Sequence, residues 1–322
     1  MLDYRMPLVL VLILLSNVLI RAQTPAAALD HYQHGINKFQ KGDLDGAIEE
    51  YTKAIEISSQ LAPTKRASAN PLNGNGFADS ADESNRITII DPFTAHAYSN
   101  RAMARYKKGD LDGAIADCDR ALRITPGLAA AYLNRGAARR DRGDLQEAME
   151  DYNRAIAIDH RMAEAYNNRG TLRQDLGDID GALSDLDQAI ALNPRIAEIP
   201  YHRGFARLAK RDFNGALADF DRAIELNPRL AWAYQGRGTT WMGKGNLKRA
   251  VVDFSRAVEL QPDLAVAYAN RGLALLCQGR KMEAEKDFAK CLAISPDMKA
   301  DVEMRIKKAN ELLATGKWRD KD

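Results

Sequence analysis

The chain has 322 residues, and its 46 lysines and arginines nearly balance its 44 aspartates and glutamates. A near-neutral chain lacks the basic surface of a nucleic-acid-binding protein, so we expect no nucleic-acid partner. The three cysteines, Cys118, Cys277 and Cys291, are too few for a disulfide framework. A low aromatic content of 7% favours helix over sheet.

The chain begins with a segment typical of a secretory signal peptide. Arg5 precedes an apolar run from Pro7 to Ile20, and the small residue Ala22 follows. As a helix the run would be roughly 21 Å long, which is short for a hydrocarbon core of about 30 Å. We therefore expect residues 1–22 to be cleaved, which leaves an exported protein, periplasmic or extracellular, without an integral membrane domain. The alternative is an uncleaved N-terminal membrane anchor.

A 14-residue segment then recurs along the chain. GDLDGAIEEYTKAI from Gly42 returns as GDLDGAIADCDRAL from Gly109, and related segments begin at Gly143 and Gly177. From Gly109 onward the spacing is 34 residues. A fixed period of this length is the signature of a repeat architecture. With Ala28 at position 1, the period defines seven units: residues 28–61, 95–128, 129–162, 163–196, 197–230, 231–264 and 265–298.

Residues 62–94 interrupt this period as an insertion between the first and second units. The stretch NPLNGNGFADSADESN within it has no hydrophobic periodicity and is rich in Asn, Gly, Ser and Asp. Such a composition predicts a disordered surface loop. The alternative is a docking loop that acts through Ile87, Ile89 and Ile90.

Each unit is predicted to form two helices. A glycine near position 15, followed by Asp, marks the turn between them, and proline at position 32 ends the second helix in five units. Position 8 is Gly or Ala and position 24 is bulky in most units. Position 20 is alanine throughout: Ala47, Ala114, Ala148, Ala182, Ala216, Ala250 and Ala284.

These positions, with an aromatic residue at position 4 such as Tyr98, Tyr132 or Tyr166, resemble the tetratricopeptide repeat. The resemblance covers residues 28–298. It implies an all-α fold, a right-handed α-solenoid of seven 34-residue helix-turn-helix repeats. Repeat 5 departs from the pattern, because Pro200 occupies the aromatic position and Arg211 replaces the turn glycine.

Residues 299–322 follow the last repeat and lack its period. Val302, Ile306, Ala309 and Leu313 share one helical face. We expect a capping helix and tail that seal the last repeat.

The resemblance implies a concave groove lined by positions 2, 5, 6, 9 and 12 of each first helix. Position 6 holds a column of asparagines, which can donate to and accept from a peptide backbone: Asn100, Asn134, Asn168 and Asn270. The alternative is that Asn is the family's usual residue here and binds no ligand.

The groove changes character along the chain. Repeats 3 and 4 contribute polar residues, whereas repeats 5 to 7 contribute an apolar strip: Tyr201, Phe205, Leu208, Trp232, Met242, Leu273 and Leu276. An exposed strip of this size indicates partner contact. The alternative is that the terminal helix covers it.

Arginine at position 7 and aspartate at position 23 recur in phase from repeat 2 to repeat 7. We expect an ion-pair ladder between the helices. An anion-binding stripe is the alternative.

No catalytic, cofactor or metal motif emerges. The segment from Gly238 to Gly245 resembles a phosphate-binding loop, but Gly245 stands where Ser or Thr should be, within a repeat helix. We therefore expect a non-enzymatic scaffold or adaptor that binds a peptide or protein in its concave groove, with no cofactor. The alternatives are a self-associating structural repeat protein, for example a homodimer, and, more remotely, a hydrolase that uses groove carboxylates.

Overall fold

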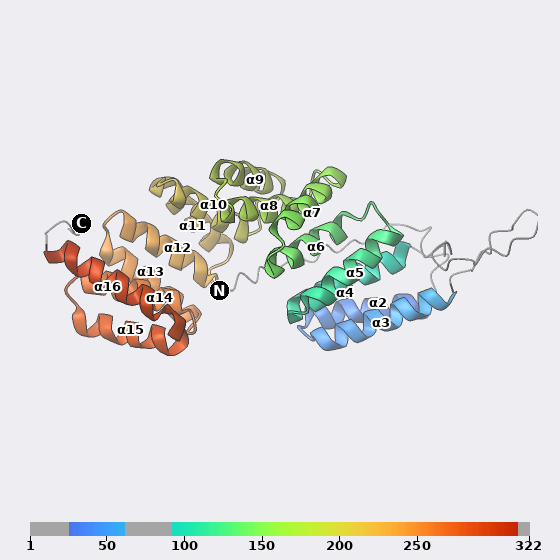
Figure 1. The fold of residues 1–322 in the computed structure, drawn as a ribbon, viewed down its shortest axis with the longest axis horizontal. Helices are drawn as coiled ribbons and strands as arrows, with labels where there is room; N and C mark the ends of the chain where they lie inside the picture. The colour runs from blue at the N-terminus through green and yellow to red at the C-terminus, as the bar shows by residue number, and fades with distance from the viewer. Residues whose placement is uncertain (1–25, 62–91, 315–322) are drawn as a thin grey trace, which may run out of the picture. The chain divides into compact units, whose positions relative to one another are not determined.

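The computed structural model describes residues 26–61 and 92–314, which contain fifteen α-helices and no strand (Figure 1). The described residues form two compact units, unit 1 up to Ala165 and unit 2 from Tyr166 onward. The predicted signal peptide and most of the predicted insertion lie outside the described residues.

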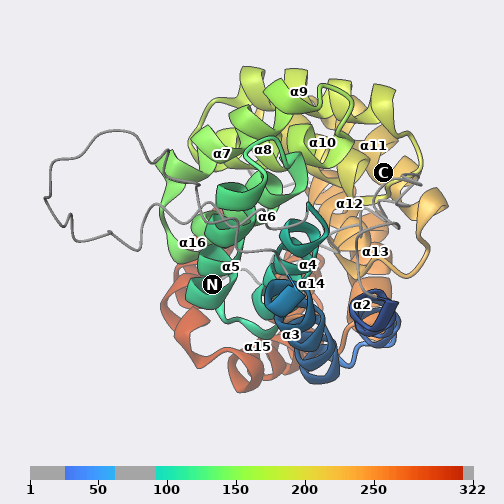
Figure 2. The ribbon, with the colours of Figure 1, turned by 90° about the vertical axis from the view of Figure 1, so that its right-hand side faces the viewer.

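Unit 1 contains three helix pairs. Its helices are α2 (Ala26–Gln40), α3 (Leu44–Leu61), α4 (Pro92–Lys108), α5 (Leu111–Ile124), α6 (Ala129–Arg142) and α7 (Leu145–Ile158). Within the unit, the second helix of one pair packs on the first helix of the next, α3 on α4 and α5 on α6 (Figure 2). Helix α4 begins three residues before the expected start of repeat 2, because Phe93 is fully buried against Tyr32.

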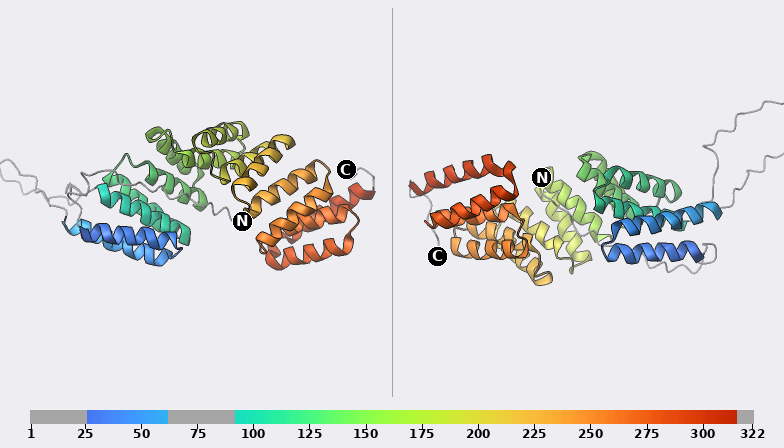
Figure 3. Two further views of the ribbon diagram at one scale, coloured as in Figure 1. Left: turned by 180° about the vertical axis from the view of Figure 1, so that it is seen from behind. Right: turned by 90° about the horizontal axis from the view of Figure 1, so that it is seen from below.

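Unit 2 continues the same pattern. Its helices are α8 (Ala163–Asp175), α9 (Ile179–Leu192), α10 (Glu198–Ala209), α11 (Phe213–Leu226), α12 (Ala231–Gly243), α13 (Leu247–Leu260), α14 (Ala265–Cys277), α15 (Lys281–Ile294) and α16 (Lys299–Ala314). The terminal helix α16 packs on α14 beside the last repeat (Figure 3). The predicted α-solenoid of helix-turn-helix repeats with a capping helix is therefore confirmed.

Each pair closes through a small residue at position 8 and a bulky one at position 24. A Cβ atom added to Gly35, Gly136, Gly204, Gly238 or Gly272 would lie 2.7–2.9 Å from an aromatic ring carbon of position 24. Repeat 2 exchanges these sizes, because Ala102 packs against the smaller Cys118. A larger residue at one of these two positions therefore requires a smaller residue at the other.

The turns between paired helices need a left-handed residue. Gly42, Gly109, Gly143, Gly177, Gly245 and Gly279 have φ between 80° and 100°, and Arg211 takes the same place in repeat 5 with φ of 60°. The following Asp then caps the second helix in several repeats; for example, Asp110 accepts from the backbone N–H of Gly113 at 2.9 Å. Repeat 5 therefore keeps the turn although it lacks the glycine.

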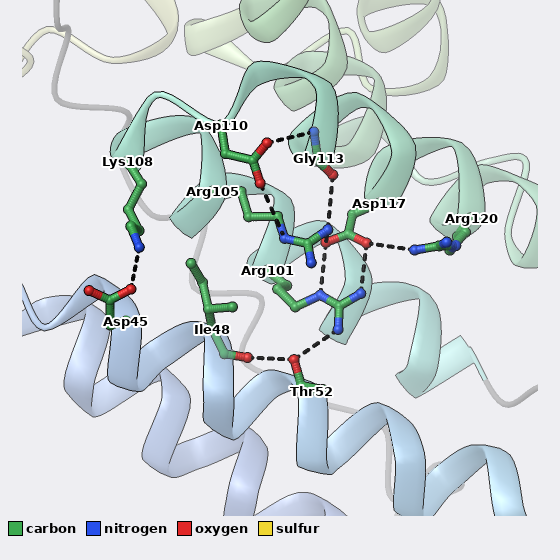
Figure 4. A network of polar contacts seen from close by, with 10 residues as sticks. All are labelled: Asp45, Ile48, Thr52, Arg101, Arg105, Lys108, Asp110, Gly113, Asp117 and Arg120. Carbon is green, nitrogen blue, oxygen red and sulfur yellow. Dashed lines mark hydrogen bonds and ion pairs between the residues drawn. The ribbon is translucent and has the colours of Figure 1, made fainter.

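The predicted ion-pair ladder is confirmed. In repeat 2, Arg101 donates to Asp117 through Nε and Nη2 at 2.8 and 2.7 Å, and Arg105 adds an ion pair to Asp117 at 3.0 Å (Figure 4). The same pairing of positions 7 and 23 recurs within every later repeat: Arg135–Asp151, Arg169–Asp185, Arg203–Asp219, Arg237–Asp253 and Arg271–Asp287. These ion pairs fix the rotation of each first helix about its axis. They therefore determine which face of that helix remains available to a partner.

The ladder also joins successive repeats. Arg135 reaches back to Asp119 in the preceding repeat at 2.6 Å, as Arg203 and Arg237 reach back to Asp187 and Asp221. In repeat 2 the acceptor is neutral, because Arg101 Nη1 donates to the Thr52 hydroxyl at 2.9 Å (Figure 4). A planar guanidinium suits this double role, since it presents several donors in a fixed geometry.

Candidate partner-binding groove

The asparagine column lies on the first helices, but part of it serves packing between repeats. Asn100 donates to the Tyr32 hydroxyl at 2.8 Å, and Asn134 donates to the backbone oxygen and hydroxyl of Ser99, both at 3.2 Å. Tyr32 and Ser99 each occupy position 5 of the preceding repeat. In unit 1 the amide groups of these two asparagines therefore hold neighbouring repeats together.

The hydroxyl of Tyr32 is suited to this acceptor role. Burial raises the pKa of Tyr32 to about 12, although the hydrogen bond from Asn100 opposes the shift. The hydroxyl therefore stays neutral across the physiological range. Sequence reasoning missed this contact; the signal was the pairing of Asn at position 6 with a hydroxyl residue at position 5 of the previous repeat.

In unit 2 the column is also enclosed. Asn168 and Asn270 are both buried, and Asn168 Oδ1 accepts from Asn167 at 3.3 Å. Thr171 bonds to the backbone oxygen of Asn167 at 2.8 Å. Gln174 Oε1, at position 12 of the same helix, is buried without a hydrogen-bond partner in the described part of the chain. Repeat 4 thus presents a compact polar cluster.

The predicted apolar strip is less exposed than expected. Tyr201 is only 5% exposed and packs on Phe220 and on Phe205, with ring centroids 6.4 and 5.2 Å apart. Leu273 and Leu276 are also buried, in a cluster that includes Val302 of the terminal helix. The expectation that these three side chains are exposed is wrong, because they belong to the cores of their repeats.

Repeat 7 fits the alternative that the terminal helix covers the strip. Val302 and Ala309 of α16 are buried in the same cluster as Leu273 and Leu276, and Ile306 packs on it. Burying this apolar face removes it from water. The end of the groove is therefore occupied by the chain itself.

The partly exposed remainder lies on α10 and α12. Phe205, Leu208 and Trp232 pack at the edge of the Tyr201 cluster, and Met242 packs at the edge of the cluster around Phe254. Glu198, at position 2 of repeat 5, begins α10, and burial raises the pKa of its carboxyl group. Phe205, Leu208, Trp232 and Met242, here called the repeat 5–6 patch, are the surviving part of the predicted strip.

The described residues offer little for chemistry. Burial raises the pKa of the thiols of Cys118, Cys277 and Cys291, which keeps them protonated at neutral pH. The described part of the chain contains no cluster of three or more His, Cys, Asp or Glu suited to a metal ion. Among the described helices, none combines the length and the apolar character needed to cross a membrane.

Sequence models of the tetratricopeptide repeat match residues 31–61, 95–128, 163–196 and 265–298, and a further TPR repeat model matches residues 136–177. The chain therefore belongs to the tetratricopeptide repeat family. Proteins of this family generally mediate protein–protein interactions.

Two curated proteins are similar over a limited stretch. RNA polymerase II-associated protein 3 of Xenopus laevis is 32% identical over 99 residues, 30% of this chain and 15% of that protein. Heat shock protein STI1 of Saccharomyces cerevisiae is 31% identical over 99 residues, 30% of this chain and 16% of that protein. The matched stretch spans less than two thirds of either relative, so the similarity concerns their repeats.

Two solved structures share the fold. A tetratricopeptide repeat protein from Parabacteroides merdae aligns with a TM-score of 0.58 and 20% identity, over 88% of this chain and 99% of that chain. PilW, a widely conserved type IV pilus biogenesis factor, aligns with a TM-score of 0.58 and 22% identity, over 63% of this chain and 94% of that chain. At these identities the likeness shows the fold alone.

Proposed function

We propose that this protein is a non-enzymatic scaffold that binds a segment of a partner protein against the first helices of repeats 5 and 6. The observation that carries the proposal is the repeat 5–6 patch. Its four large apolar side chains keep part of their surface in solvent on two successive first helices. Trp and large aliphatic side chains of this kind anchor partners when a ligand desolvates them.

The polar surroundings favour an extended segment of polypeptide. Gln174 of repeat 4 belongs to the same unit, and its Oε1 is a buried acceptor without a hydrogen-bond partner in the described part of the chain. A backbone N–H of a bound peptide could satisfy this acceptor. The apolar patch would then bind side chains and Gln174 would bind backbone.

Site-specific photo-crosslinking tests the proposal. A benzophenone amino acid would replace Leu208, in the patch, or Met282, which is 75% exposed on α15. We expect a partner to crosslink at position 208 and not at position 282, and we expect Trp232→Ala to reduce the crosslink. Equal crosslinking at both positions would sink the proposal. Light scattering over a range of concentrations separates a foreign partner from a second copy of the chain.

We also propose that the protein is exported. The support is the apolar run from Pro7 to Ile20, followed by Ala22. Mass spectrometry of the protein recovered from separated cell fractions tests this. An exported chain that begins at Gln23 is expected; a full-length chain in the membrane fraction would favour the anchor, and a full-length chain in the cytosol would overturn export.

A further inference from the structure

Repeat 6 lacks a contact that repeats 2, 4 and 5 share. In repeats 2, 4 and 5, the arginine at position 11 donates to the backbone oxygen of the glycine at position 19 and pairs with the aspartate at position 23. The donor–glycine pairs are Arg105–Gly113 at 3.3 Å, Arg173–Gly181 at 3.3 Å and Arg207–Gly215 at 3.2 Å. Figure 4 shows this arrangement in repeat 2, where Arg105 reaches Gly113 and Asp117.

In repeat 6 both residues of this contact differ. Position 11 is Trp241 and position 19 is Arg249, so the cation has moved from the first helix to the second. The guanidinium carbon of Arg249 lies over the Trp241 ring, 4.6 Å from its centroid. Arg249 forms no ion pair with a carboxylate within the described ranges. Asp253 is therefore left with Arg237 alone.

A pocket of about 360 Å³ opens at this exchange. It is lined by Asp221, Arg237, Trp241, Lys248, Arg249, Val252 and Asp253. Val252 is 68% exposed beside it. None of the lining residues belongs to the repeat 5–6 patch, so the pocket is a second surface within unit 2.

One cation of the lining has no carboxylate partner among the described residues. Both carboxylates are already bound to Arg237, each at 2.6 Å from a guanidinium nitrogen. Arg249 adds a further guanidinium, and the first turn of α13 has no acidic residue. The pocket therefore combines the guanidinium of Arg249 with the apolar surfaces of Trp241 and Val252.

We propose that this pocket binds an acidic side chain of a partner protein together with the apolar side chain beside it in sequence. The carboxylate would accept two hydrogen bonds from the guanidinium of Arg249. The neighbouring apolar side chain would lie against Trp241 and Val252. The inference does not depend on the groove, because different residues carry it.

The size and chemistry of the pocket support this occupant. A volume of about 360 Å³ is at the small end of the range of roughly 300–1,000 Å³ for ligand sites. Such a volume suits one or two side chains of a peptide. Trp and Arg together form the kind of pair that dominates binding energy at protein interfaces.

Fluorescence anisotropy with defined peptides tests the proposal. The probe is a fluorescein-labelled peptide that alternates Asp or Glu with Phe, and its matched controls replace the acids by Lys or the Phe residues by Gly. We expect only the acidic and aromatic probe to bind. We expect Arg249→Glu to weaken its binding by about tenfold or more, since an interfacial charge is reversed.

A second variant, which restores the missing contact, excludes misfolding as the cause of weaker binding. Trp241→Arg combined with Arg249→Gly recreates the contact of repeats 2, 4 and 5, and it should fold while filling the pocket. We expect it to weaken probe binding by about tenfold as well, because both binding surfaces are removed. Circular dichroism and the melting temperature would show that the fold is retained.

Two controls separate this site from its alternatives. Arg222→Glu reverses an exposed charge on α11 outside the pocket, and Trp232→Ala alters the groove patch. We expect both to bind the probe like the parent protein. Equal loss with Arg222→Glu, loss with Trp232→Ala instead of Arg249→Glu, or competition by inorganic phosphate as strong as by unlabelled peptide would overturn the proposal.

Discussion

Repeats 2 and 6 are built on the same plan but use it differently. Both pair an arginine at position 7 with a buried aspartate at position 23 through two hydrogen bonds. In repeat 2 this aspartate, Asp117, also pairs with Arg105 and Arg120, whereas in repeat 6 Trp241 leaves a pocket. The comparison teaches that positions 7 and 23 hold the helix pair, while position 11 can change and leave a pocket.

The largest expected effect comes from removing Asp117, the aspartate that pairs with three arginines in repeat 2. Asp117→Ala leaves the buried guanidinium of Arg101 without its carboxylate, and we expect the free energy of unfolding to fall by about 3–5 kcal/mol. The corresponding change in repeat 6, Asp253→Ala, should cost less, because Arg237 keeps its ion pair with Asp221. Urea unfolding followed by circular dichroism measures both changes.

Amide hydrogen exchange would locate the loss of stability in each variant. Amide protection should drop first in α4 and α5 for Asp117→Ala, and in α12 and α13 for Asp253→Ala. Equal losses of stability in the two variants would contradict the distinction between the two repeats.

In repeat 1 the corresponding ion pairs contain a glutamate, Glu50, and they are lost as the pH falls. This carboxylate, at position 23, pairs with His31 at position 4 and Lys38 at position 11, at 2.7 and 3.1 Å. The hydrogen bond with His31, aided by that from Lys38, lowers the pKa of Glu50 from 4.5 to about 2, although burial opposes the shift.

The sign of the pH effect follows from this lowered pKa. Stability from Glu50 is complete above pH 4.5, the ordinary value, and is lost as the pH falls toward about 2. The shift sets an upper value of about 3 kcal/mol for the loss. Urea unfolding between pH 5 and pH 2 should therefore show a steeper loss for the parent protein than for Glu50→Gln. Parallel pH profiles would contradict the assignment.

The exchange of sizes in the helix pair gives a smaller effect. In repeat 2, Cys118→Phe would force a ring against Ala102, and we expect it to cost about 1–3 kcal/mol by overpacking. Adding Ala102→Gly recreates the pairing of Gly238 with Phe254 in repeat 6 and should recover part of that loss. A double-mutant cycle in urea measures the coupling, and simple additivity of the two changes would show that the positions do not share one volume.

The sequence was sufficient for the fold and the ladder, because both repeat. Seven aligned copies reveal which positions pack, as at Gly238 and Phe254, and which carry opposite charges in phase, as at Arg237 and Asp253. The terminal helix was also predictable, since Val302, Ile306 and Ala309 share one face. The packing positions and the ladder depend on local geometry that recurs in the aligned copies.

The surface was harder to predict. Tyr201 and Leu273 occupy groove positions by number, but their exposure depends on the packing of neighbouring helices, which a repeat pattern does not specify. The asparagine column was interpreted as ligand-facing, whereas Asn100 and Asn134 donate to the preceding repeat. The pocket at Trp241 was missed, because its signal is a departure from the pattern at two positions in one repeat.

The smallest effect concerns the turns. Gly109 of repeat 2 and Gly245 of repeat 6 have φ of 85° and 83°, whereas Arg211 of repeat 5 has φ of 60°. A non-glycine residue in this left-handed region costs roughly 1–2 kcal/mol. We therefore expect Arg211→Gly to raise the free energy of unfolding by about 1 kcal/mol, since glycine removes the strain but gains freedom in the unfolded chain. Gly109→Ala is the matched reverse change and should destabilise by a similar amount. A lower melting temperature for Arg211→Gly would mean that contacts of the arginine side chain outweigh the strain of its backbone.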